Sequence, residues 1–206
     1  MTLADKFHAK FIYNRRLDTL CELIQTFIKK HGCTEILDVG AGDGKLDKMI
    51  LSVTPCEITG VDVLIRENTF IPIELYDGKH IDKEDGSIDA VMAVDVLHHT
   101  DNPAKLFKEL CRVSGKYIII KDHTVHGPIS YLKLKLMDYV GNKRFNVRLQ
   151  YNYLTSTEWN QLFDENDLYV ISYNSDLHLY KGLCHLLFDS NLQFIVLLKK
   201  RSKTWS

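Results

Sequence analysis

Residues 35–46 read EILDVGAGDGKL. A short apolar run at 36–39 leads into three glycines at alternate positions, Gly40, Gly42 and Gly44. A buried strand that enters a glycine-rich turn and then a helix is one way to build a nucleotide pocket. The stretch therefore predicts a nucleotide site and leaves open which nucleotide it holds.

The composition of the chain is that of an ordinary globular domain. Its 206 residues suit a single domain, 1–206, with a sizeable core. Apolar residues make up 45% and charged residues 26%, both near the average for soluble proteins. The formal net charge is -1, so no global field attracts nucleic acid or a membrane.

The cysteines and the N-terminus indicate a cytoplasmic protein. The five cysteines are scattered singly without C-x-x-C spacing, which favours a reducing compartment over a disulfide framework. The first residues, MTLADKFHAKF, lack the apolar core of a signal peptide. No apolar run is long enough to cross a bilayer, so we expect no membrane insertion.

Strand-like and helix-like patterns alternate along the first 122 residues. Alternation of this kind predicts a parallel sheet with helices on both faces. The expected elements are an N-terminal helix at about 4–30, strands at 35–39, 57–63, 71–75, 88–94 and 116–122, and helices at 44–52 and from Asn102 to Arg112.

The pattern changes after the fifth strand. Residues 127–141 form an extra helical segment, and Thr155 with Glu158 has capping-box spacing ahead of a helix that reaches about 165. The last strands are expected at 168–174 and 191–199. Because no room remains for a crossover helix between them, they should pair antiparallel, and the sheet should have seven strands.

The glycine turn does not fit the two commonest nucleotide motifs. A dinucleotide fingerprint needs glycine where Lys45 stands, and no G-K-[ST] sequence marks a phosphate loop. Four aspartates follow the predicted strands at or near their carboxyl ends: Asp38, Asp43, Asp62 and Asp77. They would repel a pyrophosphate by about 4 kcal/mol for a close like-charge pair. They would attract S-adenosylmethionine, which bears a sulfonium and an ammonium.

From about Ile36 to Ser172 the sequence resembles the class I S-adenosylmethionine-dependent methyltransferases, within the type 11 group. The resemblance rests on ILDVGAGDG, GVDV, the YDG turn, DGSIDAVMAVDVLHH and the helix after Asn102. It implies an α/β, Rossmann-like fold with a seven-stranded, mostly parallel sheet, the last strand antiparallel and helices on both faces. It also implies methyl transfer from S-adenosyl-L-methionine.

The resemblance and the chemistry together assign the cofactor residues. Gly40 and Gly42 allow the backbone to approach the methionine part of the cofactor. Asp38 is expected to set the turn and meet the ammonium group, and Asp62 resembles the acidic residue that accepts bonds from both ribose hydroxyls.

Further residues should complete the cofactor site. Asp77 and Gly78 resemble the pair that meets the adenine edge. Arg15 or Arg16 could meet the methionine carboxylate, Arg16 being the candidate, and a solvated helix face is the alternative. The other expected cofactor-binding residues are Ala41, Val63, Asp95 and Val96.

Four histidines follow the fourth and fifth strands: His98, His99, His123 and His126. Histidine titrates near neutrality and can serve as a general base where the acceptor loses a proton. We expect His98 and His123 to be catalytic; the alternative is that both only shape the pocket. No metal is expected; the alternative is a metal ion held by His123 and His126 together with a carboxylate.

Residues 124–154 should form an acceptor-side lid. Tyr131, Tyr151 and Asn152 are the expected substrate-binding residues, with ordinary packing as the alternative. The same stretch is locally basic through Lys133, Lys135, Lys143, Arg144 and Arg148. That charge suits either a solvated face or an acidic or lipid-headgroup substrate.

The function expected is methyl transfer to a small-molecule acceptor. The sequence DVLH after the fourth strand lacks an amino-selecting tetrapeptide such as N/D-P-P-Y, which favours oxygen or carbon acceptors. The alternatives are an RNA or protein methyltransferase and a catalytically silent cofactor-binding scaffold. Near-zero net charge argues against nucleic acid, and the sequence does not indicate an oligomeric state.

Overall fold

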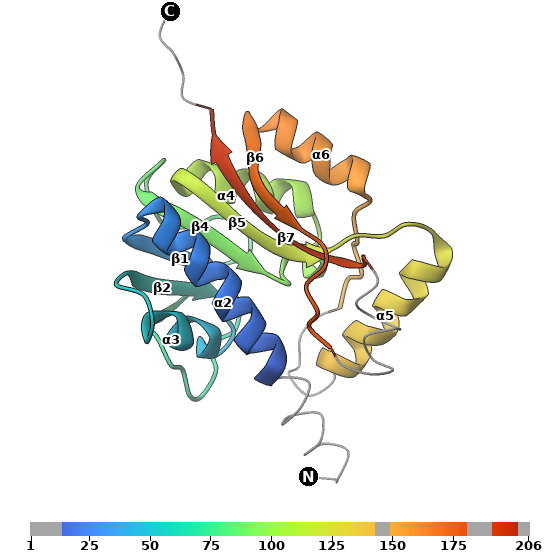
Figure 1. Cartoon of the computed structure of the whole chain (residues 1–206), viewed down its shortest axis with the longest axis horizontal. Coiled ribbons are helices and arrows are strands. Elements are labelled where there is room, and N and C mark those ends of the chain that lie inside the picture. Colours follow the sequence, from blue (N-terminus) through green and yellow to red (C-terminus); the bar gives the residue numbers. More distant parts are fainter. Residues whose placement is uncertain (1–13, 143–148, 181–190, 202–206) are drawn as a thin grey trace, which may run out of the picture.

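The computed structural model describes residues 14–142, 149–180 and 191–201. Their core is a seven-stranded sheet in the order β3-β2-β1-β4-β5-β7-β6 (Figure 1). The strands are β1 Glu35–Val39, β2 Glu57–Asp62, β3 Ile73–Leu75, β4 Ile88–Val94, β5 Ser114–His123, β6 Leu168–Asn174 and β7 Gln193–Lys200. The helices are α2 Asn14–His31, α3 Lys45–Leu51, the 3-10 turn η2 Leu97–His99, α4 Pro103–Val113, α5 Pro128–Asn142 and α6 Ser156–Glu165.

The strand directions confirm the predicted fold class. β1 pairs parallel with β2 and β4, β2 with β3, and β4 with β5. β7 runs antiparallel to both β5 and β6, between which it lies. β7 can pair with both strands in this way because an antiparallel pair needs no crossover helix.

Both faces of the sheet are covered by helices. Alternate residues of β1 serve opposite faces: Leu37 joins the core under α4 and α6, and Ile36 joins the core under α2 and α3. Figure 1 shows α2 crossing the near face of the sheet. The nearly unbroken apolar run of β4 is thus explained by burial from both sides.

Two helices begin at the predicted caps. Asn102 accepts a hydrogen bond from the backbone N–H of Lys105 through its side chain, with Pro103 in the first turn. Thr155 and Glu158 form a reciprocal capping box at the start of α6.

The predicted bounds differ from the observed ones mainly at element ends. The predicted start of the N-terminal helix at about residue 4 lies outside the described residues, which begin at Asn14. β5 is longer than expected at both ends, and its last residue is His123. None of the helices in the described ranges has both the length and the apolar character needed to cross a membrane.

α5 stands apart from the two helix layers, at the right of Figure 1. It packs on a small separate core formed by Leu134, Tyr153 and Leu192. This core lies beside the end of β5, since Thr124 bridges to Leu154 and its backbone N–H donates to the carbonyl of Leu192. The segment after β5 therefore covers the carboxyl edge of the sheet.

Candidate functional site

The carboxyl ends of β1, β2, β4 and β5 meet at one edge of the sheet, where open α/β proteins bind their ligands. At this edge the turn after β1 folds back on β2, because the N–H groups of Gly40 and Ala41 both donate to the carbonyl of Val61. Gly40 has φ +81°, and a Cβ on it would approach Val96 to 2.5 Å. Glycine is needed here for conformation and for space.

Asp62 fixes the glycine turn from the end of β2. One carboxylate oxygen accepts from the N–H of Gly42 at 2.8 Å and the other from the N–H of Leu64 at 3.0 Å. A carboxylate oxygen has a second lone pair, so both oxygens keep acceptor capacity for ligand hydroxyls. A Cβ on Gly42 would have only the Arg66 side chain within reach, at 3.8 Å, so the space beside this turn is open.

The loops after β2 and β3 present an apolar surface beside Asp62. Val63, Leu64 and Ile65 are 60%, 48% and 42% exposed. Gly78, at φ +77°, lies so close that a Cβ would approach Val63 to 3.1 Å. The carboxylate of Asp77 accepts from the N–H groups of the two residues that follow Gly78, which holds its pKa below the usual value. Asp77 thus stabilises the turn that contains Gly78.

Asp38 is buried and faces a second buried carboxyl group that the sequence reading missed, Asp47 in the first turn of α3. Both oxygens of Asp47 and one of Asp38 lack a hydrogen-bond partner. Burial, together with the neighbouring carboxyl, raises the pKa of Asp38, and burial raises that of Asp47 to about 7. In the sequence, Asp47 is marked only by its acidic side chain at a core-facing position of the helix after the glycine turn.

These features fit S-adenosylmethionine. A buried carboxyl oxygen without a partner suits a cationic ligand. An anchored carboxylate beside an exposed apolar surface suits a ribose joined to an adenine. The residues that would hold the cofactor are Asp38, Gly40, Gly42, Asp62 and Val63.

Asp95 follows β4 in a conformation that is rare outside glycine, with φ +58°. Its carboxylate pairs with Arg16 and, at 2.5 Å, with the fully buried Lys121. Burial alone would raise the pKa of Asp95, but these cations hold it well below the usual value. The structure thus brings Arg16 to the predicted site, paired with Asp95. Sequence reasoning missed Lys121 because β5 reads as an apolar strand.

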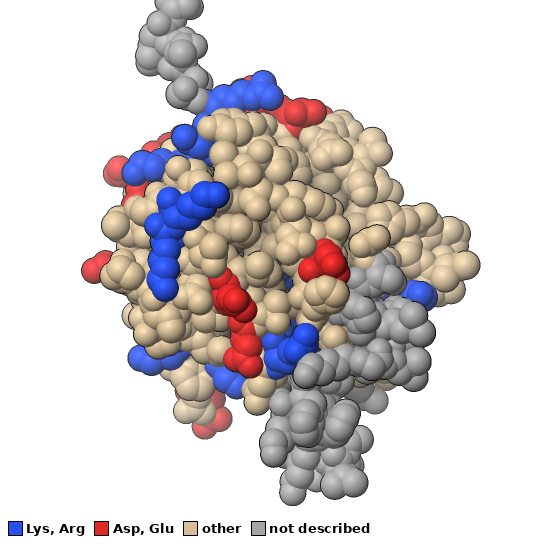
Figure 2. Space-filling model, viewed as in Figure 1, with Lys and Arg blue, Asp and Glu red and all other residues tan. Residues whose placement is uncertain are grey.

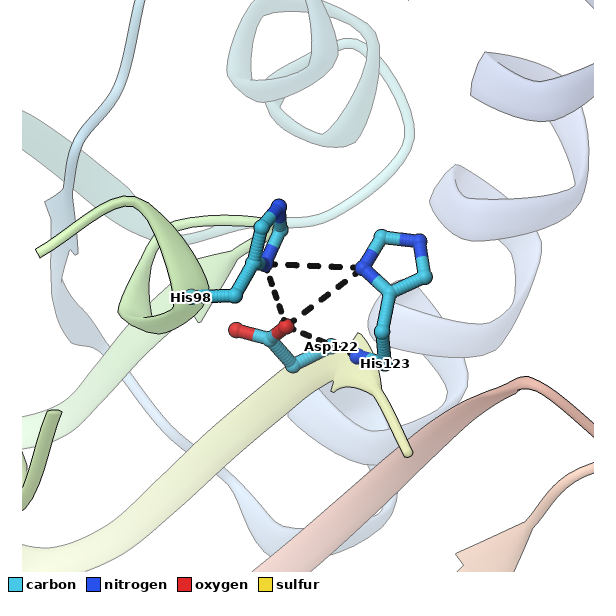
Figure 3. A group of neighbouring side chains, drawn as sticks. All are labelled: His98, Asp122 and His123. Carbon is cyan, nitrogen blue, oxygen red and sulfur yellow. Dashed lines mark hydrogen bonds and ion pairs between the residues drawn. The ribbon is translucent and has the colours of Figure 1, made fainter. Parts of the chain in front are cut away.

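His98 is buried between two carboxylates. Its Nδ1 lies 2.5 Å from Asp122 Oδ1 and its Nε2 lies 3.2 Å from Asp138 Oδ2 of α5 (Figure 3 shows the Asp122 side). Burial alone would lower the pKa of His98, but the two carboxylates raise it to about 10. Both carboxylates thus favour the charged imidazole, and the catalytic role of His98 stays a prediction.

His123 has the opposite state. It is 3% exposed, and burial next to Lys121 lowers its pKa, so the ring is neutral near pH 7. Its Nδ1 lies 3.4 Å from His98 Nδ1 and 3.5 Å from Asp122 Oδ1 (Figure 3). Its Nε2 is buried without a partner. A neutral ring with an unpartnered nitrogen can accept a proton.

The group His98, Asp122 and His123 also has the donor types of a metal site, as does the group His98, His99 and Asp138. However, Asp122 Oδ1 already accepts from the His98 ring and from the backbone N–H of His123. The carboxylates of Asp95, Asp122 and Asp138 are balanced by His98, Lys121 and Arg16. The charges of this network therefore balance among the protein's own side chains. In the described part of the chain neither metal-type group includes His126, which is exposed and contacts the carbonyl of Asn191.

The expected substrate residues gather around Tyr153. Its ring packs against Tyr131 at 5.7 Å and Tyr151 at 6.4 Å, and stacks on His98 at 5.3 Å. Tyr153 is buried and donates its hydroxyl to Asp138 at 2.5 Å. Asn152 donates a side-chain amide hydrogen to the carbonyl of Thr100, which ties this loop to the turn that carries the histidines.

Comparison with known proteins agrees with this geometry. A family model described as a methyltransferase domain matches residues 11–173. No curated protein matches the chain. Among solved structures, magnesium protoporphyrin IX methyltransferase from Synechocystis PCC 6803, with bound S-adenosylhomocysteine, is 12% identical, with a TM-score of 0.64 over 98% of this chain and 89% of that one.

Two further structures show the same fold. A protein of Pyrococcus horikoshii OT3 is 18% identical, with a TM-score of 0.66 over 95% of this chain and 99% of that one. An S-adenosylmethionine-dependent methyltransferase from Mesorhizobium loti is 12% identical, with a TM-score of 0.58 over 81% and 90% of the two chains.

The chain belongs to this methyltransferase family, because the model covers most of its length. The predictions of a class I S-adenosylmethionine-dependent methyltransferase and of its cofactor are confirmed at this level.

Proposed function

We propose that this enzyme methylates a small molecule at an oxygen or carbon atom, with His123 as the general base. The observation that supports the base is the contrast within one pair of rings: His98 is held charged by two carboxylates, and His123 is neutral with an unpartnered Nε2. The other expected catalytic residue, His98, then serves as a positioning residue.

The bound cofactor supplies a methyl group on a sulfonium, and transfer requires an acceptor held in line with it. The chain's residues supply alignment and a proton acceptor. His123 Nε2 takes the proton that a hydroxyl or acidic carbon loses, and the Asp122 carboxylate beside Nδ1 stabilises the ring as it becomes charged. Tyr131 and Tyr151 would line the acceptor pocket.

The predicted domain description also enters as a proposal. We regard 1–206 as one methyltransferase domain in which 124–154 is the acceptor-side lid. Its support is that α5 and the loop at 151–153 both contact His98, through Asp138 Oδ2 and through the Asn152 N–H.

The acceptor is found by incubating the protein with methyl-labelled S-adenosylmethionine and a cell extract and identifying the labelled product. Formation of S-adenosylhomocysteine with a labelled small molecule supports the proposal. Labelled RNA or protein would replace it with the corresponding alternative, and no turnover with intact cofactor binding would favour the scaffold.

The base is tested with the identified acceptor. His123→Ala should lower turnover by about 10²–10⁴-fold, and the parent's rise in rate with pH through His123's pKa, below 6.5, should disappear. Cofactor affinity should stay within about threefold, since His123 is not assigned to the cofactor. Nitrogen NMR at pH 7 should show His98 charged and His123 neutral. A neutral His98, or full turnover in His123→Ala, would contradict the assignment.

A further inference from the structure

The α5 helix carries an apolar face on its outer side as well as its inner side. Its outward side chains are large and apolar: Ile129 at 75%, Leu132 at 66%, Leu136 at 55%, Tyr139 at 49% and Val140 at 54% exposure. At about 100° per residue they fall within an arc of about 100°. We call these five residues the outer face of α5. Figure 2 shows mostly uncharged side chains over the part of the α5 region at the right that grey atoms do not cover, with a blue group beside the grey atoms.

The opposite side of the helix already has its partners. Leu134 is buried in the small core with Tyr153. Asp138, the only acidic residue of α5, is turned inward to His98 and to the Tyr153 hydroxyl. The outer face is therefore not the side that holds α5 to the protein, and a contiguous exposed apolar strip of this kind marks an interaction surface.

Lysines border the outer face on both sides. Lys133 falls just beyond Val140 around the helix, and Lys135 falls just beyond Tyr139, at about 100° per residue. Lys135 is exposed, with its ammonium 5.0 Å from the Tyr151 ring centroid. The chain continues past α5 with Lys143, Arg144 and Arg148 and with no acidic residue before 149.

We propose that the outer face of α5 docks on an anionic membrane surface. An apolar strip with lysines on both borders is the pattern of a helix lying in the plane of a lipid interface, where the stems of the lysines reach up to acidic headgroups. A second copy of the chain fits less well, because two such faces would bring their lysines together. The inference stands apart from the proposed function, because it is measured without turnover.

The test uses the whole protein and vesicles. With phosphatidylcholine vesicles containing about one third phosphatidylglycerol, the protein should sediment with the lipid. Pure phosphatidylcholine should bind it much less, and raised salt should release it. The double variant Leu132→Gln and Leu136→Gln should lose at least about tenfold in vesicle affinity, and Lys133→Gln with Lys135→Gln should lose the preference for anionic lipid.

Matched controls keep the result interpretable. Val53 and Val170 are 45% and 47% exposed outside α5, so their double change to Gln should leave vesicle binding unaltered. Unchanged circular dichroism and cofactor affinity in all variants verify folding. The proposal is overturned if the parent does not bind anionic vesicles or if the leucine variant binds them like the parent. It is also overturned if the parent is a dimer that dissociates in the leucine variant.

Discussion

At the scale of single residues, the site is decided by how buried charges find partners. Asp95 is partly buried and ionised because Lys121 and Arg16 reach it. Asp38 and Asp47 have no cation among their strongest contacts, so burial keeps a proton on the pair. Aspartate therefore has opposite protonation states at the ends of the neighbouring strands β1 and β4.

This difference predicts how stability depends on pH. The pKa of Asp47 is raised from 3.8 to about 7 in the folded chain, so the folded form holds a proton that the unfolded form releases. The resulting stability is present at low pH and is lost as the pH rises through about 7. Asp47→Asn cannot ionise, so its gain in stability over the parent should grow by about 2–3 kcal/mol between pH 5 and pH 8 in the cofactor-free protein, because about two pKa units of roughly 1.4 kcal/mol each separate pH 5 from the folded pKa.

Urea unfolding of parent and variant across pH 5–8.5 measures this effect. Asp18→Asn, a change at an exposed position of α2, serves as the control and should not alter the slope. Equal pH slopes in the parent and in Asp47→Asn would mean that Asp47 is ionised throughout, with a partner.

The ion network at His98 predicts independence from metal. Because Asp122 is already engaged by His98 and its three-carboxylate network is balanced, dialysis against a chelator should change neither the melting temperature nor turnover. The melting temperature is measured by calorimetry before and after chelation, and again after zinc is added back. A fall in melting temperature that zinc restores would identify these residues as ligands.

At the scale of elements, helix and strand identity could be predicted well because it depends on local signals. The Asn102 cap, the Thr155–Glu158 box and the apolar run of β4 all specify their elements without reference to the rest of the fold. The burial of a polar residue, in contrast, could not be predicted from local signals. Nothing near Lys121 or Asp138 in the sequence shows that their partners, Asp95 and His98, lie on another element.

The attachment of α5 predicts an effect on its dynamics. Tyr153→Phe removes the hydroxyl that donates to Asp138, at a cost of about 1–2 kcal/mol for a buried bond. Amide exchange in α5 should then accelerate by about tenfold while the sheet is unaffected. Hydrogen exchange followed by mass spectrometry measures the exchange rate of α5, with Tyr173→Phe on β6 as the control. Unaltered exchange in α5 would show that the apolar contacts alone hold the helix.

At the scale of the whole molecule, the order of strands brings the strand-end residues predicted for the cofactor to one edge of the sheet. The glycine turn, Asp62 and Asp95 follow β1, β2 and β4, and parallel pairing brings those ends together. This could be predicted because an alternating chain has few ways to form a parallel sheet. The states of the two histidines could not, because they depend on Asp122 and on an aspartate of α5 that reaches back over the edge.

The central claim is that the cofactor lies on this edge with its ribose at Asp62, and calorimetry with S-adenosylhomocysteine tests it. The parent should bind at micromolar strength or tighter, and NAD should not bind. Asp62→Ala should weaken binding by about 10²–10⁴-fold, since two charge-assisted bonds of about 1.5–3 kcal/mol each are lost. Asp62→Asn, which keeps the shape, should lose less. Asp82→Ala, an exposed position beside Glu35 at the opposite edge, should bind like the parent. Parent-like affinity in Asp62→Ala would contradict the account.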